Sequence, residues 1–200
     1  FADMYKEINL PFWVQTRAET IILKPSRVKT LKEIGCHRIS LGLEHGNAEF
    51  RRKVILKGFE NQMMIDATRH LAKAGIQLTI NNIIGFPDET RELAFDTIEL
   101  NRRFNSDNTS CSILVPFHGT ELHDLCVQKG YLDPNIICAV STSGESLLNM
   151  PKWDKEDMIR LRDVFAMYIK FPKTRWPEIH EAETNMELRG WLREEFIKTY

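Results

Sequence analysis

The sequence predicts an α/β protein built on a parallel sheet, and three observations carry that prediction. Short apolar segments alternate along the chain with longer segments whose apolar residues recur at helical spacing. Gly35 and Gly75, forty positions apart, each end a helical segment. An apolar strand follows each glycine after a short step. Such βα units join through right-handed crossovers, which produces a parallel sheet.

The expected elements also limit the architecture. Strands are expected at 10–15, 37–43, 76–84 and 110–115, and helices at 26–34, 61–74, 89–104, 121–130, 154–169 and 178–198, with 131–151 mostly loop. Ser26 is the expected N-cap of the first helix. Four parallel strands are too few to close a barrel. The chain is therefore either an open doubly wound sheet or the later part of a parallel barrel, with a helical C-terminal tail.

Composition and charge exclude several classes of protein. The 200 residues are 42% apolar, which is enough for a sizeable core. Their 27 basic and 28 acidic side chains give a net charge of −1, which does not favour wrapping of nucleic acid. No apolar run is long enough for a membrane span. The four cysteines are far apart and form no Cys-x-x-Cys, so a reducing cytoplasmic setting is expected.

Polar residues stand at the carboxyl ends of the expected strands, where parallel α/β proteins bind ligands. Glu44 lies in Gly-Leu-Glu-His-Gly, and its carboxylate could accept hydrogen bonds from a ribose diol; a capping or loop role is the alternative. Lys57 suits a ligand carboxylate or phosphate, or is a solvated loop lysine. Arg51, Arg52 and Lys53 are expected to form a solvated basic face.

The third strand ends in a second candidate stretch. Asn81 is polar, Ile83 and Ile84 suit an adenine ring, and Gly85 would let such a ring lie against the backbone. After the first strand, Arg17 could pair with a ligand carboxylate, or with Glu19 or Glu44.

Two further groups resemble sites but have structural explanations. Asp88, Glu89 and Thr90 are the residue types that a helix N-terminus favours, so we expect capping roles for them. The polar residues at 118–126 match no zinc spacing, so we expect no metal site there.

Three motifs, in order, resemble the radical S-adenosylmethionine (radical SAM) superfamily. Gly-Leu-Glu-His-Gly at 42–46 is similar to Gly-Ile-Glu-Ser-Gly of cobalamin-binding and related members. Asn-Ile-Ile-Gly-Phe-Pro-Asp-Glu-Thr at 82–90 is similar to the family's Ile-x-Gly-x-Pro-Gly-Glu-Thr. Pro-Phe-His-Gly-Thr-Glu-Leu at 116–122 is similar to Pro-x-Pro-Gly-Thr-x-Leu. The resemblance implies the later strands of a parallel (βα)6 partial barrel over 1–132, followed by an extension over 133–200.

The resemblance also implies cofactors and roles. S-adenosylmethionine and a 4Fe–4S cluster are implied, with cobalamin as a candidate, an electron donor such as flavodoxin or ferredoxin, and reductive cleavage to a 5′-deoxyadenosyl radical. It places Glu44 and Asn81 near the ribose, Lys57 at the SAM carboxylate, and Ile83, Ile84 and Gly85 at the adenine. Asp88 and His45 depart from the family's Gly and Ser.

The larger departure is the missing Cys-x-x-x-Cys-x-x-Cys, which would hold the cluster. Because the sequence also begins mid-pattern, we expect it to be the C-terminal part of a longer enzyme and inactive alone. Two alternatives stay open: a conventional α/β-barrel enzyme acting on a phosphorylated small molecule, and a non-catalytic scaffold that uses the C-terminal helices as a partner surface.

Overall fold

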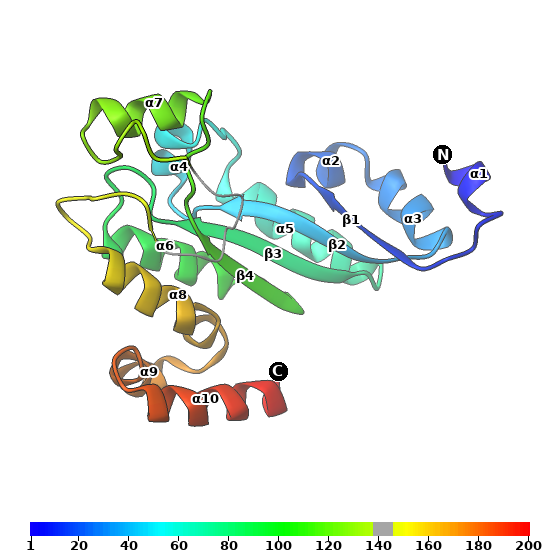
Figure 1. Ribbon diagram of the computed structural model, residues 1–200. Coiled ribbons are helices and arrows are strands. Elements are labelled where there is room, and N and C mark those ends of the chain that lie inside the picture. Colours follow the sequence, from blue (N-terminus) through cyan, green and yellow to red (C-terminus); the bar gives the residue numbers. More distant parts are fainter. Residues whose placement is uncertain (138–145) are drawn as a thin grey trace.

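A parallel four-stranded sheet organises the protein, as Figure 1 shows in a computed structural model that describes residues 1–137 and 146–200. The strands are β1 (Phe12–Thr16), β2 (Cys36–Glu44), β3 (Gln77–Ile84) and β4 (Asn108–Ile113). They lie in the order β1-β2-β3-β4, and each neighbouring pair is parallel. The predicted α/β class with a parallel sheet is confirmed, and all four carboxyl ends lie at one edge.

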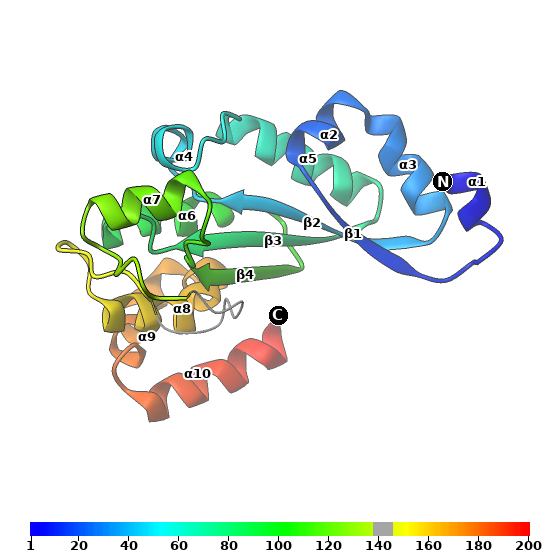
Figure 2. The ribbon, with the colours of Figure 1, turned by 45° about the horizontal axis from the view of Figure 1, so that its top comes forward.

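The helices are α1 (Ala2–Tyr5), α2 (Ala18–Leu23), α3 (Pro25–Glu33), α4 (Ala48–Val54), α5 (Asn61–Lys73), α6 (Arg91–Asn101), α7 (Glu121–Gln128), α8 (Lys155–Lys170), α9 (Trp176–Ala182) and α10 (Met186–Thr199), with a 3₁₀ turn at Lys173–Arg175. α3 packs on β2, α5 and α6 on β3, and α8 on β4. Figure 2 shows α2, α3 and α5 on one side of the sheet. Polar side chains lie in register on its other face, including Asn81 beside Ser110.

Two hydrophobic clusters hold these layers together. One lies between β2, β3 and α5 and contains Leu41, Ile80 and Leu71. The other joins the ends of β3 and β4 to the C-terminal helices, through Ile84 and Leu161 among others. Residues on both sides of position 132 share this second cluster. The division at 132 stays a prediction.

A charged network ties the C-terminal helices to α6. Arg91 of α6 donates to Glu183 at 2.7 Å and to Asp157 at 2.9 Å. The hydroxyl of Tyr168 donates to the same Glu183 carboxylate at 2.5 Å. Glu183 is only 4% exposed, and the Arg91 guanidinium balances its buried charge. Burial and the Glu183 carboxylate raise the pKa of the Tyr168 hydroxyl, so it stays a donor at neutral pH.

Several expected helix boundaries were wrong, for local reasons. The helix expected at 178–198 is two helices, because the side chain of Asn185 accepts from Leu188 N–H and caps a new helix. The helix expected to be capped by Ser26 begins instead at Pro25, whose fixed φ suits a first helical position. α2 and α4 were not expected at all. Part of the expected loop, 138–145, lies outside the described residues.

Candidate functional site

A cavity of about 690 Å³ opens at the carboxyl edge of the sheet, within the size range of small-molecule sites. All four strands or the segments after them contribute to it. Its polar lining includes Gln15, Glu44, Lys57, Asn81, Ser110 and Ser112, and its apolar lining includes Ile55, Ile83, Phe86, Leu114, Phe117 and Leu122. Of the residues expected at the site, Glu44, Lys57, Asn81 and Ile83 are brought together here.

Glu44 occupies a strained turn at the end of β2. Its φ is +62°, and His45 N–H donates to Leu43 O at 2.9 Å, which closes a γ-turn around it. A non-glycine residue in this conformation costs about 1–3 kcal/mol, and such strain gathers at ligand sites. Gly42 makes room for the carboxylate, since a Cβ there would lie 2.4 Å from Glu44 Oε1. The turn therefore holds an acidic group at the cavity.

Lys57 pairs with this carboxylate across the cavity. Its Nζ donates to Glu44 Oε1 at 2.7 Å, and the lysine side chain is 32% exposed against 16% for the glutamate. Among the described residues that line the cavity, these are the charged side chains, and they neutralise each other. A ligand without net negative charge suits such a pair better than a phosphate does, because a phosphate adds uncompensated negative charge.

β3 presents its residues to two different surroundings. Asn81 and Ile83 line the cavity, and Ser110 Oγ donates to Asn81 Oδ1 at 2.9 Å. Ile84 is fully buried in the hydrophobic cluster behind the sheet. At Gly85, with φ +83°, a Cβ would lie 3.1 Å from Met158 Sδ, so this glycine allows α8 to approach. The adenine-contacting roles of Ile84 and Gly85 stay predictions.

Arg17 does not reach the cavity lining. Its guanidinium donates to Glu19 at 2.5 Å, which is one of the two partners expected from the sequence if Arg17 does not bind a ligand. The arginine side chain is 68% exposed. From the same strand, Gln15 lines the cavity instead. A ligand role for Arg17 stays a prediction.

Apart from Ile83, the apolar part of the lining was missed by sequence reasoning. Phe117 and Leu122 lie in the stretch that leads from β4 into α7, and Phe86 follows Gly85. Their apolar character was visible in the sequence. No periodicity marked them as facing a cavity, because they lie in turns or at the start of a short helix.

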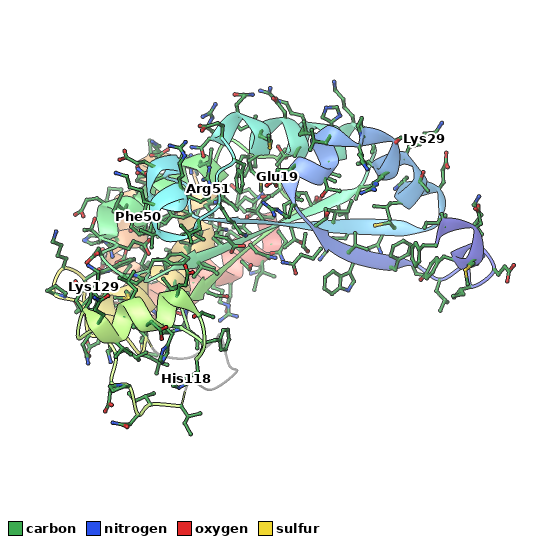
Figure 3. The ribbon with its side chains drawn as sticks, turned by 90° about the horizontal axis from the view of Figure 1, so that it is seen from above. Glu19, Lys29, Phe50, Arg51, His118 and Lys129 are labelled. Atoms are coloured by element: carbon green, nitrogen blue, oxygen red, sulfur yellow. The ribbon has the colours of Figure 1, made fainter. Side chains whose placement is uncertain are left out.

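Arg51 was expected on a solvated face, and this was wrong. The side chain is fully buried in α4, where it donates to His45 O and Phe59 O, both at 2.6 Å, and to Asn61 Oδ1 at 2.9 Å. Figure 3 shows it beside Phe50 on α4. Burial lowers the pKa of the guanidinium. Its three acceptors explain why a charged group is tolerated there.

The expected caps before α6 have separate roles. Thr90 caps the helix, accepting from Leu93 N–H at 3.4 Å. Asp88, with φ +64°, accepts from the Tyr131 hydroxyl at 2.7 Å and pairs with Lys129 at 2.8 Å. Glu89 is fully buried beside His45. Only Thr90 is a cap of the expected kind.

The described residues do not hold an iron–sulfur cluster. They contain no group of three His, Cys, Asp or Glu side chains that could hold a metal ion. Cys36 belongs to one hydrophobic cluster, whereas Cys126 belongs to the other. Cys138 lies outside the described residues. The part of the chain that is described supplies a cavity and polar groups, not cluster ligands.

The fold and the cavity define a class: a parallel, partial βα barrel whose strand ends line a cavity. The chain belongs to the radical SAM superfamily, whose family model matches residues 2–101. The uncharacterized methyltransferase PH0819 of Pyrococcus horikoshii is 35% identical over 82% of this chain and 36% of its own length. Cytidylyl-2-hydroxyethylphosphonate methyltransferase of Streptomyces wedmorensis is 22% identical over 80% of this chain and 32% of its own. The chain thus spans about a third of these relatives.

Two solved structures share the fold. The radical S-adenosylmethionine methyltransferase TsrM from Kitasatospora setae, solved with cobalamin and a 4Fe–4S cluster, matches with a TM-score of 0.58 at 14% identity, over 97% of this chain and 48% of TsrM. Elp3 from Methanocaldococcus infernus matches with a TM-score of 0.54 at 20% identity, over 64% of this chain and 32% of Elp3. The predicted partial barrel and the predicted family are confirmed. Enzymes of this superfamily use S-adenosylmethionine and a 4Fe–4S cluster.

Within residues 1–137 and 146–200, no helix combines the length and the apolarity that a membrane span requires.

Proposed function

We propose that this chain is the S-adenosylmethionine-binding part of a radical SAM methyltransferase. The observation that carries the proposal is the Glu44–Lys57 pair, held by a strained turn at the edge of a cavity of suitable size. Glu44 would accept hydrogen bonds from the ribose diol, and Lys57 would pair with the carboxylate of the methionine part. Ile83 and Phe86 offer apolar surface to the adenine.

The wider reaction is part of the same proposal. The names of both curated relatives support methyl transfer as the reaction class. Reductive cleavage of S-adenosylmethionine, by one electron from a flavodoxin or ferredoxin, would give methionine and a 5′-deoxyadenosyl radical. Cobalamin is a candidate second cofactor, as in TsrM. We place the protein in the cytoplasm. We assign no step of the electron transfer to the residues described, which bind and orient the cofactor.

Calorimetric titration with S-adenosylhomocysteine tests the binding. We expect this chain to bind it, and Glu44→Gln and Lys57→Met each to weaken binding about tenfold or more, since each removes a charged hydrogen bond. Lys53→Met is the matched control, because Lys53 is 72% exposed and pairs with Glu49 of its own helix. No binding by the unchanged chain, or equal losses in all three variants, would contradict the proposal.

A phosphorylated ligand is less well supported. A phosphate at Lys57 would bring a net negative charge beside the Glu44 carboxylate, whereas the carboxylate of S-adenosylmethionine is offset by its own ammonium and sulfonium groups. Binding of inorganic phosphate or a sugar phosphate, with none of S-adenosylhomocysteine, would favour that alternative.

A further inference from the structure

His45 and Glu89 form a buried pair directly behind the Glu44 turn. Both side chains are fully buried, and His45 Nε2 lies 3.2 Å from Glu89 Oε1. Asn47 N–H donates to His45 Nδ1 at 3.1 Å, which places the ring proton of a neutral imidazole on Nε2, facing the carboxylate. This contact lacks hydrogen-bond geometry, and among the described residues neither of the two atoms has a hydrogen-bond partner. Burying such a pair is costly, so its presence calls for a role.

The pair connects two strand ends that both reach the cavity. The second oxygen of Glu89 accepts from Phe86 N–H at 2.9 Å, and Phe86 lines the cavity. On the other side, His45 directly follows Glu44 and closes its γ-turn. A continuous path therefore runs from the turn that holds Glu44, through the imidazole and the carboxylate, to the turn after β3.

Hydrogen bonds to side chains of α4, α5 and α6 also fix the backbone around His45. Arg51 donates to His45 O at 2.6 Å, and Asn61 donates to Gly46 O at 2.9 Å. Gly46 N–H donates to Thr97 Oγ1 at 2.8 Å. Since both carbonyls and the Gly46 amide are engaged, the imidazole can move only if the Glu44 turn moves with it.

We propose that His45 is a positioning residue for Glu44: through Glu89 it fixes the strained turn, and thereby aims the Glu44 carboxylate at the ribose diol. The inference rests on the proposed function, because it needs a diol at Glu44. If His45 has this role, it determines how strongly the site prefers a ribose that carries both hydroxyls. It does not determine the overall affinity for a nucleoside.

Adenosine and 2′,3′-dideoxyadenosine measure that preference directly, by calorimetry or NMR titration of this chain. We expect the unchanged chain to prefer adenosine about tenfold or more, the value of a hydrogen bond to a charged acceptor. His45→Asn keeps an acceptor for Asn47 N–H but is too short to reach Glu89, so the preference should largely disappear. His45→Gln can still reach Glu89 and should retain it. His70→Asn, on the exposed side of α5, is the matched control.

A double-mutant cycle separates positioning from stability. Glu44→Gln also removes the preference, so adding His45→Asn to it should cause no further loss if both act on one contact. If His45→Asn weakens both nucleosides equally, or retains the preference, or adds fully to Glu44→Gln, the positioning role is overturned. If His45→Asn does not fold, Glu89→Gln replaces it with the same expected loss. If the unchanged chain shows no preference for the diol, the role proposed for Glu44 fails first, and this inference with it.

Discussion

Gly46 is the position where α6 approaches the β2 turn most closely, and Gly46→Ala should destabilise the protein strongly. A Cβ there would lie 2.3 Å from Asp96 O and 2.5 Å from Thr97 Cα. Both are helix backbone atoms, so no side-chain rotation relieves the clash. Ordinary carbon contacts lie at about 3.5–4.0 Å, so α6 must shift by about 1 Å. Overpacking of a rigid contact costs about 1–3 kcal/mol, and we expect the upper end.

Urea unfolding followed by circular dichroism measures this loss. Gly58→Ala is the matched control, because no atom lies within 4 Å of a Cβ added there, and its effect should stay within about 0.5 kcal/mol. The reasoning is refuted if Gly46→Ala loses less than about 1 kcal/mol, or no more than Gly58→Ala.

Two further predictions concern the surface and the core. Hydrogen bonds from Lys129 and, to a smaller extent, from Tyr131 lower the pKa of the Asp88 carboxyl below its ordinary 3.8. The ionised carboxylate therefore stabilises the folded state at neutral pH, and this stabilisation is lost as the pH falls through the lowered pKa. Asp88→Asn should therefore narrow the difference in Tm between pH 7 and pH 3, and an unchanged difference would contradict this. Leu161→Ala should cost about 2–5 kcal/mol in urea unfolding, since Leu161 is fully buried between the sheet and the C-terminal helices. Met186→Ala, at a 77% exposed position, should cost almost nothing.

The sheet could be predicted because its signals are local. An apolar strand that follows a glycine-ended helix needs no tertiary information, and Gly35 and Gly75 do adopt positive φ at those helix ends. α4 could not be predicted in this way. Its seven residues carry three adjacent basic side chains, and the burial of Arg51 depends on acceptors in the segments before and after the helix, whose position the sequence pattern does not indicate.

The sequence predicts which strand ends carry the site, but not which face of a strand lines the cavity. Glu44 and Asn81 were identified because polar residues at the carboxyl ends of parallel strands meet at one edge. Whether Ile83 or Ile84 faces the cavity depends on which side the helices cover, and α8, which lies far along the chain, decides that by packing against Gly85.

The conformation of the Glu44 turn depends on the packing of helices around it. The positive φ of Glu44 costs about 1–3 kcal/mol, which other contacts of the fold must offset. Arg51 and Asn61 donate hydrogen bonds to the carbonyls of the next two residues, and Thr97 Oγ1 accepts one from Gly46 N–H; each contributes about 1 kcal/mol or more. Because these three side chains belong to α4, α5 and α6, the turn is held only when all three helices are packed. A substitution that disturbs the packing of any of these helices should therefore displace the Glu44 carboxylate before it disturbs the sheet.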